Sequence, residues 1–418
     1  MADSVHRKLA RLKPGSLFVG TDLGLDTNVA KVTDVNAAVL AVIRFSHTRG
    51  GYDYLAERLA SCVRRHHASG VVVAMEPTNY FWMLLAAELE RRRIDYRLVN
   101  AYTARKHREG DQIDRSKDDP RDAFAIAELL RTGKFTETRL LHDGYAEVRQ
   151  QVVLHDRLQR DITRQKILLR TTVGQLFPEL TTVFADLAGD TARAMLRNHA
   201  AAAVVRKMSE KDFIAAVRAD STGRRLMVSK LCRAHRLASV SFGLVDGIQA
   251  LQLAVRMQLE TLPLLETQTA EARRALTQTF SALPEAPYLL SVPAFGQITA
   301  ATILAEIGDP RNFRNGSQLV KLAGTQPVPN TSGRKTRSFT PMSHQGRPRL
   351  RTILYFACLR LIQVNDDFAS EYRRLQQRAK NPLTKKQALG ALMNKLLRVL
   401  WALMRDQVCY DPAMAQAT

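Results

Sequence analysis

Four carboxylates stand at positions from which they could converge on one site. Asp22 ends the apolar run in VGTDLG, and Glu76 ends the β-branched run in VVVAMEP. Asp119 and Asp122 lie three residues apart, so on a helix they share one face. Because groups at the ends of neighbouring strands of an α/β sheet converge above the sheet edge, we expect the four side chains to meet there.

Such a cluster has a definite chemistry. Carboxylates repel one another and tolerate close approach only when a cation joins them. Hard oxygen ligands suit Mg²⁺ or Mn²⁺, which keep positions open for substrate phosphates. Two such ions about 4 Å apart clamp the attacking and leaving oxygens of a phosphodiester. The four residues therefore predict metal-dependent cleavage of a nucleic acid.

Each carboxylate also has an ordinary interpretation when it is taken alone. Asp22 could be a turn residue, and Glu76 a loop carboxylate before a proline. Asp119 could be a helix N-cap, and Asp122 a first-turn residue that favours the helix dipole. Asp118 competes with Asp119, but it is not three residues from Asp122 and would face away. The glycines around Asp22 also resemble the first phosphate loop of actin-like ATPases, whose second glycine-rich hairpin and adenosine loop are not evident.

A second candidate centre lies in the C-terminal half. Ser332 stands in the polar turn NTSGRK, where a hydroxyl among cations could attack a phosphate and form a covalent ester with DNA. Ser-Gly in a loop is usually only a turn. On the residues alone, Thr331, Ser338 and Ser343 are equally plausible nucleophiles, and Tyr355 is a further candidate.

The segment around Ser332 is strongly basic. Residues 331–351 include no acidic residue, and Lys and Arg side chains can hold phosphates. We expect six of them to bind nucleic acid: Arg334, Lys335, Arg337, Arg347, Arg349 and Arg351.

Residues 291–298 resemble a helix-hairpin-helix element, followed by a helix predicted at 299–307. The backbone amides at the start of such a helix can grip a phosphate. These elements usually have glycine where Ala294 stands. The alternative is an ordinary helix-turn-helix corner.

The elements that must position the carboxylates lie in residues 15–145. The patterns predict strands at 17–22, 28–33, 38–45, 71–75 and 96–99, and helices at 52–67, 80–93 and 119–131. The order β-β-β-α-β-α-β-α is that of an α/β ribonuclease-H-like domain.

The rest of the chain reads as mostly helical. Residues 146–284 lack strand patterns, and long helices at 148–176 and 245–280 are expected to pack as an antiparallel pair or as a coiled coil between subunits. Residues 191–239 are also expected to be helical. Residues 285–418 form a further domain, mostly α, that ends in an apolar helix at 384–404.

Composition narrows the class of protein. The 418 residues include 62 Lys and Arg against 40 Asp and Glu, a net charge of +22, which favours a polyanionic partner. A hydrophobic content of 45% argues against a ribosomal protein. No apolar stretch of about 20 residues and no signal-peptide core occur, so we expect a cytoplasmic location and no membrane partner. The four cysteines are far apart and indicate buried reduced thiols rather than a zinc site or disulfides.

Together these motifs resemble the DEDD-type insertion-sequence transposases, the bridge-RNA-guided serine recombinases. The resemblance covers almost the whole chain. Their RuvC-like domain is matched by GTD at 20–22, AMEP at 74–77 and KDDPRDA at 117–123. Their second conserved domain is matched by SVP at 291–293, residues 300–308, AGTQP at 323–327 and SG at 332–333.

This resemblance implies a mechanism. The family's acidic residues correspond to Asp22, Glu76, Asp119 and Asp122, which would be both catalytic and metal-binding, and its nucleophile corresponds to Ser332. Mg²⁺ or Mn²⁺ would be the cofactor, and one strand end would be held as a phosphoserine before it is rejoined. A non-coding guide RNA would pair with the element ends and the target DNA. Homodimers or homotetramers would form, with the RuvC-like domain of one subunit completing the serine site of another.

Two other functions remain open on the sequence. A metal-dependent, structure-selective nuclease, such as a Holliday-junction resolvase, would use the carboxylates and water without Ser332. A non-catalytic DNA- or RNA-binding protein would keep its main activity when the carboxylates are replaced.

Overall fold

The computed structural model describes residues 2–110, 119–137, 139–221, 225–328, 331–332, 335–336 and 340–412. The chain forms two compact units, Met1–Leu140 and Leu141–Thr418, which are described here one at a time. Within the described ranges, no helix is long and apolar enough to cross a membrane.

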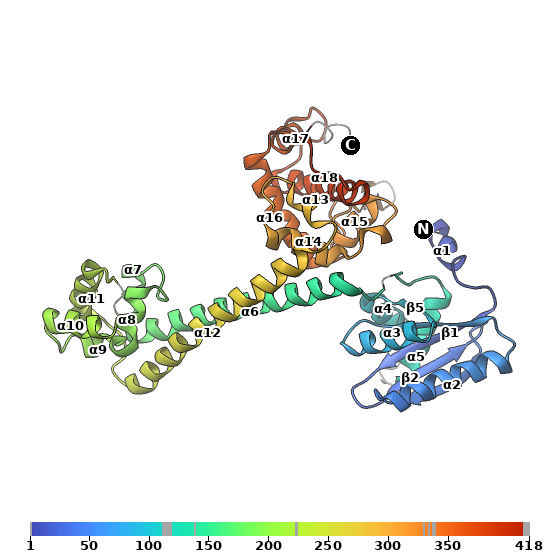
Figure 1. Ribbon diagram of the computed structural model, residues 1–418, viewed down its shortest axis with the longest axis horizontal. Helices are drawn as coiled ribbons and strands as arrows, with labels where there is room; N and C mark the ends of the chain where they lie inside the picture. The colour runs from blue at the N-terminus through green and yellow to red at the C-terminus, as the bar shows by residue number, and fades with distance from the viewer. Residues whose placement is uncertain are drawn as a thin grey trace. The chain divides into compact units, whose positions relative to one another are not determined.

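The N-terminal unit is built on a five-stranded sheet with the order β3-β2-β1-β4-β5. Figure 1 shows helices packed against this sheet. β1 pairs antiparallel with β2, and β2 with β3, whereas β1, β4 and β5 are parallel. β1, β4 and β5 therefore end at the same edge of the sheet. The strands are β1 (Ser16–Leu23), β2 (Asn28–Thr33), β3 (Val39–Phe45), β4 (Gly70–Met75) and β5 (Asp95–Leu98).

Helices cover both faces of this sheet. Side chains of β1 alternate between two cores, because Val19 packs with residues of α2 and α3 and Phe18 with residues of α5. Gly20 faces α5 at very short range. A Cβ at this position would lie 1.9 Å from the carbonyl oxygen of Ala123 and 2.3 Å from the amide nitrogen of Ala127. The helices are α1 (Ala2–Leu9), α2 (Arg49–Arg65), α3 (Phe81–Arg91), α4 (Ala101–Gly110) and α5 (Asp119–Arg131).

The C-terminal unit is organised by two long helices, α6 (Asp143–Leu176) and α12 (Ile248–Ser281), which we call the arm (Figure 1). Gln151 of α6 donates a 3.0 Å hydrogen bond to the hydroxyl of Thr279. Gln258 of α12 donates one of 3.1 Å to Thr172. The start of each helix thus lies beside the end of the other, so the pair is antiparallel.

Each end of the arm carries a hydrophobic core of its own. One core joins the arm to the short helices that we call the head, and the other joins it to the C-terminal helices. Between them, residues 156–168 of α6, all described, contribute no buried side chain. The head consists of α7 (Leu180–Val183), α8 (Asp190–His199), α9 (Ala202–Val205), α10 (Glu210–Ala219) and α11 (Val228–Val240).

The C-terminal helices pack around the end of the arm and carry one small hairpin. They are α13 (Ala286–Leu290), α14 (Gln297–Ile307), the short 3₁₀ helix η1 (Pro310–Asn312), α15 (Gly316–Ala323), α16 (Pro348–Val364), α17 (Asp366–Gln377) and α18 (Lys385–Asp406). The hairpin strands are β6 (Thr331–Ser332) and β7 (Lys335–Thr336).

The coarse predictions are confirmed: the N-terminal domain is a mixed α/β sheet, and the rest is mostly helical. The predicted strand 28–33 and helix 119–131 have the observed bounds. The pattern does not predict α4, because AYTARKHREG has few apolar residues to mark a buried face. The ribonuclease-H-like assignment, the coiled coil between subunits and the division into three domains stay predictions.

Candidate functional site

Two of the predicted carboxylates lie side by side at the edge where the parallel strands end. β1 and β4 pair with each other as far as Thr21 and Met75, so Asp22 and Glu76 follow this last pair at one level on neighbouring strands. Adjacent parallel strands lie about 4.8 Å apart. The hydroxyl of Thr21 donates a 2.7 Å hydrogen bond to the carbonyl oxygen of Ala74, which ties the two strand ends together.

The third carboxylate, Asp122, belongs to the helix that covers this corner. The backbone of α5 contacts Gly20, two residues before Asp22 on the same face of β1. At its other end, Arg131 donates a hydrogen bond to the carbonyl oxygen of Val35, which follows β2 beside the start of β1. α5 therefore runs antiparallel to β1, and its first turn lies at the Asp22 end.

The predicted metal site lies only partly within the described residues. Asp22, Glu76 and the first turn of α5 share one corner, but the side chain of Asp119 and the whole of Asp118 lie outside the described residues. Among the side chains that the structure describes, no group of three or more His, Cys, Asp or Glu is close enough to hold a metal ion. The four-carboxylate metal site therefore stays a prediction.

The loop after Glu76 is held against the end of β1 by one side chain. Asn79 donates a 3.0 Å hydrogen bond to the carbonyl oxygen of Leu23 and accepts one of 2.8 Å from the amide of Phe81. His47 stands on the same side, 2.8 Å from the hydroxyl of Tyr52 through Nδ1 and 3.1 Å from a backbone oxygen through Nε2. Burial lowers the pKa of His47, against the opposing effect of the backbone hydrogen bond.

Ser332 lies on the β6–β7 hairpin, where it pairs with Lys335. The two chain segments that lead to and from this hairpin, which we call its stem, are joined by backbone hydrogen bonds. The amide of Val328 donates to the carbonyl of Pro341 at 2.8 Å, and the amide of Ser343 donates to the carbonyl of Gln326 at 2.9 Å. The base of the stem is compact because a Cβ on Gly346 would lie 2.3 Å from the amide nitrogen of Gly324, which itself has a φ of +69°.

Several predicted nucleophiles and nucleic-acid-binding residues of this hairpin have side chains that lie outside the described part of the structure. The side chains of Ser332, Thr331 and Lys335 are not described, and Arg334, Arg337 and Ser338 lie wholly outside the described residues. Their roles stay predictions.

The three arginines at the start of α16 have internal partners that the local sequence does not reveal. Glu306 of α14 is only 3% exposed, and Arg349 binds it at 3.2 Å. Arg349 also lies 2.7 Å from Asp156 of α6. Arg347 donates to the backbone carbonyl of Glu306, and Arg351 donates to that of Ala323 at 2.8 Å. These cations brace the fold, and nucleic-acid binding by them stays a prediction.

Burial changes the chemistry of this cluster. Burial is the largest of the effects that together lower the pKa of Arg347 to about 10; the nearby charge of Arg149 also lowers the pKa, and Glu306 opposes the shift. Sequence reasoning missed Glu306 and Asp156 because they lie on other helices. The available signal was an acid in the otherwise apolar α14 sequence QITAATILAEI.

The remaining candidates are less suited to catalysis. Ser343 donates to the carbonyl of Gly324 at 3.1 Å, and Tyr355 is half-buried against the C-terminal core. The four cysteines are free, as expected, but only Cys62 and Cys358 are buried. The expectation of buried thiols is wrong for Cys409, which is exposed near the chain end.

The backbone agrees with the helix-hairpin-helix prediction at Ala294, the position where such elements usually have glycine. Ala294 adopts a φ of +68°, the left-handed conformation that glycine takes most readily, and its side chain is exposed. α14 begins three residues later, at Gln297, with two short helices thus flanking a tight turn. Phosphate binding there stays a prediction.

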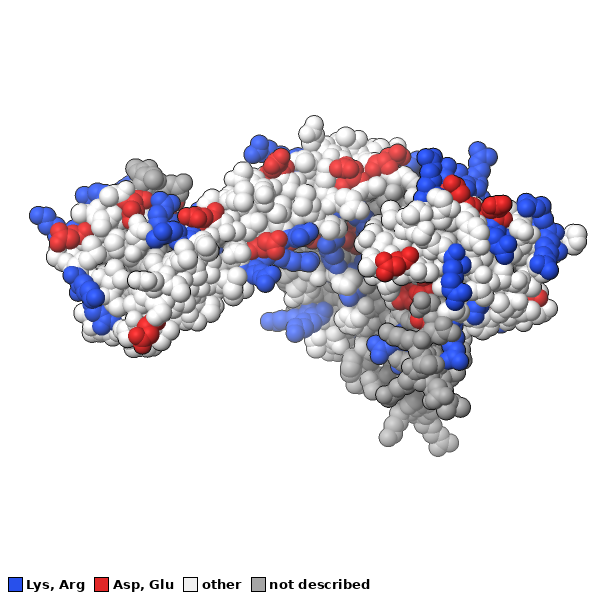
Figure 2. Space-filling view, turned by 90° about the horizontal axis from the view of Figure 1, so that it is seen from below, with Lys and Arg blue, Asp and Glu red and all other residues white. Residues whose placement is uncertain are grey.

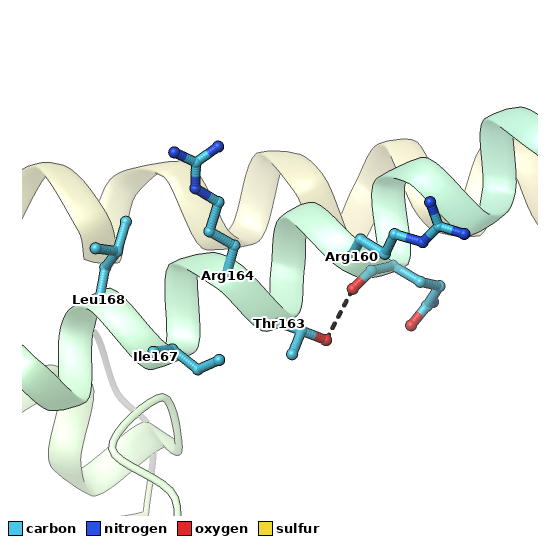
Figure 3. Close-up of a pocket in the computed structure, with 6 residues that line it drawn as sticks. Arg160, Thr163, Arg164, Ile167 and Leu168 are labelled. Atoms are coloured by element: carbon cyan, nitrogen blue, oxygen red, sulfur yellow. Dashed lines mark hydrogen bonds between the residues drawn. The ribbon is translucent and has the colours of Figure 1, made fainter. Parts of the chain in front are cut away.

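Figure 3 shows a surface hollow of about 400 Å³ on the arm. All of its lining residues come from α6 alone, and they include Arg160, Arg164, Ile167 and Leu168. It lacks a carboxylate, so it is the open face of a helix rather than a cleavage site. On the face seen in Figure 2, Lys and Arg are spread widely among fewer Asp and Glu.

Comparison with known proteins matches both halves of the chain. The model DEDD_Tnp_IS110, described as a transposase, matches residues 19–178, and the model described as "Transposase IS116/IS110/IS902 family" matches residues 286–373. The predicted carboxylates fall in the first range, and Ser332 falls in the second.

Relatives extend the similarity across the chain. The mini-circle putative transposase for IS117 of Streptomyces coelicolor is 25% identical over 375 residues, covering 87% of this chain and 88% of the relative. An uncharacterized 43.6 kDa protein of insertion element IS110 from the same organism is 29% identical over 311 residues, with 72% and 73% covered. A pilin gene-inverting protein of Moraxella lacunata is 29% identical over 139 residues, with 32% and 42% covered.

Proposed function

We propose that the chain is an insertion-sequence transposase of the IS110 family, and that it cuts and rejoins DNA through a phosphoserine on Ser332. The observation that carries the proposal is the carboxylate edge, where Asp22 and Glu76 follow the last pair of the neighbouring parallel strands β1 and β4, beside the first turn of α5. Water-based cleavage needs only this edge, and covalent rejoining needs Ser332 as well.

The donor set at this edge suits a hard divalent cation. DEDD transposase domains typically use divalent metal ions. Asp22, Glu76, Asp119 and Asp122 would hold Mg²⁺ or Mn²⁺, as oxygen ligands do elsewhere. When bound, the metal would offset negative charge on the scissile phosphate. We propose that this domain has a RuvC-like fold, which the strand order and the position of α5 support.

The proposed reaction conserves one phosphodiester bond. The hydroxyl oxygen of Ser332 bonds to phosphorus, and the bond from phosphorus to the leaving strand breaks. That strand departs as a hydroxyl and takes up a proton, because serine gives one up. A hydroxyl of the exchanged strand then attacks the phosphoserine, restores the DNA bond and returns Ser332. No nucleotide triphosphate is required.

The partners follow from the same proposal. DNA at the element ends and at the target would be the substrate, guided by a non-coding RNA of the element, and the protein would work in the cytoplasm. The net charge of +22 supports two polyanionic partners together. A homodimer or homotetramer is supported by the open face of α6, where Val153, Leu154, Ile167 and Leu168 are 40%, 48%, 61% and 41% exposed.

The experiment is a denaturing-gel assay on labelled element-end DNA with Mg²⁺ and the element's RNA. Wild-type protein should give a protein-linked DNA band that is lost in Ser332→Ala and in Asp22→Asn. Omitting the RNA should abolish the band in the wild type. Ser343→Ala is the matched control and should retain it.

A second function is favoured by one feature, the DEDD domain itself. A metal-dependent, structure-selective DNA nuclease would use water as its nucleophile. In that case Ser332→Ala would keep cutting without a protein-linked band, and Asp22→Asn would not cut. This outcome would replace the phosphoserine proposal by the nuclease function.

A further inference from the structure

Three aromatic rings form a short stack beside the carboxylate edge. The rings of His47 and Phe81 are parallel within 9°, with centroids 4.0 Å apart. The ring of Tyr80 lies 4.2 Å from that of Phe81, tilted by 40°. Phe81 is only 8% exposed, whereas Tyr80 is 57% exposed. The buried ring of Phe81 thus contacts both the half-buried His47 and Tyr80, whose ring is open to solvent.

The stack is held by hydrogen bonds to the elements that carry the carboxylates. His47 contacts the carbonyl oxygen of Gly24, directly after β1, and the hydroxyl of Tyr52. Asn79 links the end of β1 to the amide of Phe81. A ring platform that is fixed before binding loses little conformational entropy when a ligand stacks on it.

The platform is close to the proposed cleavage site along the chain. Tyr80 is the fourth residue after Glu76, and four residue steps along the chain span at most about 14 Å. A second tyrosine stands at the same edge, because Tyr102 follows β5 at the start of α4 and is 63% exposed. Aromatic residues thus follow two of the three parallel strands that end here.

We propose that Tyr80, backed by Phe81 and His47, is a stacking platform for an unpaired nucleobase of the strand whose phosphate lies at Asp22 and Glu76. This inference rests on the proposed function, which brings a scissile phosphate to that edge. Bases in single strands or distorted duplexes stack on exposed aromatic rings, and this contact tolerates any base. A charge of +22 favours a nucleic acid over an apolar protein segment as the occupant.

The stacking contact also has a use in the reaction. A base held on a rigid platform fixes the rotation of its own nucleotide, and through the backbone it limits the movement of the neighbouring phosphate. Tyr80 is thus a positioning residue, whereas the carboxylates act on the phosphate itself. Its loss should weaken binding of the unpaired strand and should leave the metal requirement unchanged.

The test uses the full chain without divalent metal, so that binding is measured apart from cleavage. The probes are oligothymidylate and a matching abasic strand, which has the phosphates but no bases. Tyr80→Leu should weaken oligothymidylate binding about tenfold and leave abasic binding unchanged, and Tyr80→Phe should bind like the wild type. Tyr54→Leu, at a 47% exposed tyrosine on α2, is the matched control and should bind like the wild type.

Photo-crosslinking locates the contact. An oligothymidylate strand with one iodouracil should crosslink to the peptide that contains Tyr80 in the wild type. Equal oligothymidylate binding by wild type and Tyr80→Leu, with crosslinks only elsewhere, would overturn the proposal. So would Tyr80→Leu binding like the wild type while Tyr80→Phe does not, because an apolar protein contact tolerates leucine and a base stack does not.

The variant Asp22→Asn separates this inference from the proposed function. It should keep oligothymidylate binding and lose Mg²⁺-dependent cleavage. If Asp22→Asn keeps cleavage, the carboxylate mechanism is wrong, and the crosslink to Tyr80 then tests the stacking platform independently. If it loses cleavage while Tyr80→Leu binds normally, only the stacking platform is wrong.

Discussion

Replacing Gly20 by alanine should disrupt the carboxylate corner through the backbone alone. The new Cβ would lie 1.9 Å from the carbonyl oxygen of Ala123, and ordinary contact begins near 3.4 Å. α5 must therefore retreat by about 1.5 Å, the difference between those distances, and Asp122 must move with it. Overfilled cores lose about 1–3 kcal/mol, and a clash with helix backbone belongs at the upper end, about 3 kcal/mol. A displacement beyond about 1 Å at a reacting group costs roughly 100-fold in rate.

Urea unfolding followed by circular dichroism measures the first effect, and the element-end cleavage assay measures the second. Gly50→Ala is the matched control, because a Cβ there meets nothing within 4 Å and the residue lies in the first turn of α2. That variant should be neutral or up to about 1 kcal/mol more stable. If Gly20→Ala unfolds at the same urea concentration as the wild type and cleaves at the same rate, the close approach of α5 to β1 is wrong.

Three further changes test other parts of the fold. Ala294→Gly should raise the unfolding free energy by about 0.5–1 kcal/mol, because glycine adopts the +68° φ without strain. The control Ala270→Gly, at an exposed position within α12, should lower the unfolding free energy by about 1 kcal/mol. If both variants lower the melting temperature, the first prediction is wrong. Glu306→Ala should cost about 1–3 kcal/mol, because it removes the buried carboxylate from the ion pair with Arg349, which then keeps Asp156 as a partner; urea unfolding measures this. Hydrogen bonds from Arg91 lead the effects that lower the pKa of Glu88 from 4.5 to about 2. Glu88 therefore stabilises the fold above pH 4.5 and loses this effect as the pH falls toward 2, so Glu88→Gln should flatten the pH dependence of the urea midpoint across that window.

The carboxylate edge is predictable from sequence because its signals are local. Asp22 and Glu76 each end an apolar strand run, and parallel strands that are neighbours in a sheet end at one edge. The spacing of Asp119 and Asp122 likewise needs only helix geometry. The pattern cannot show that Gly20 admits α5 so closely, because that contact joins residues about a hundred positions apart.

The partners of the basic segment cannot be predicted from the segment's own sequence, for a physical reason. Residues 331–351 contain no acid, so their arginines look available to a polyanion. In the fold, Glu306 and Asp156 come from α14 and α6 to meet Arg349. The positive charge of a segment indicates that anionic partners are needed. It does not indicate whether those partners are phosphates of a nucleic acid or carboxylates from elsewhere in the chain.

The same limit applies to the aromatic stack. The sequence EPTNYF after Glu76 contains Tyr80 and Phe81, but the third ring, His47, follows β3. Only the pairing of the strands brings that residue to the edge. Aromatic residues directly after a strand that carries a candidate carboxylate are therefore a useful signal, although the sequence alone does not tell which ring is exposed.

The spacing of the two cores along the arm bears on how the C-terminal unit unfolds. Residues 156–168 of α6 bury no side chain, so they add little hydrophobic free energy to the helix pair. Cooperativity between the head and the C-terminal helices must pass through this stretch. Opposite this stretch α12 buries only Leu262, Thr269 and Ala272, so we expect the head to open and close as a separate foldon while the helices around Ser332 remain folded. Amide hydrogen exchange should therefore be fastest at the middle of α6 and differ between its two ends.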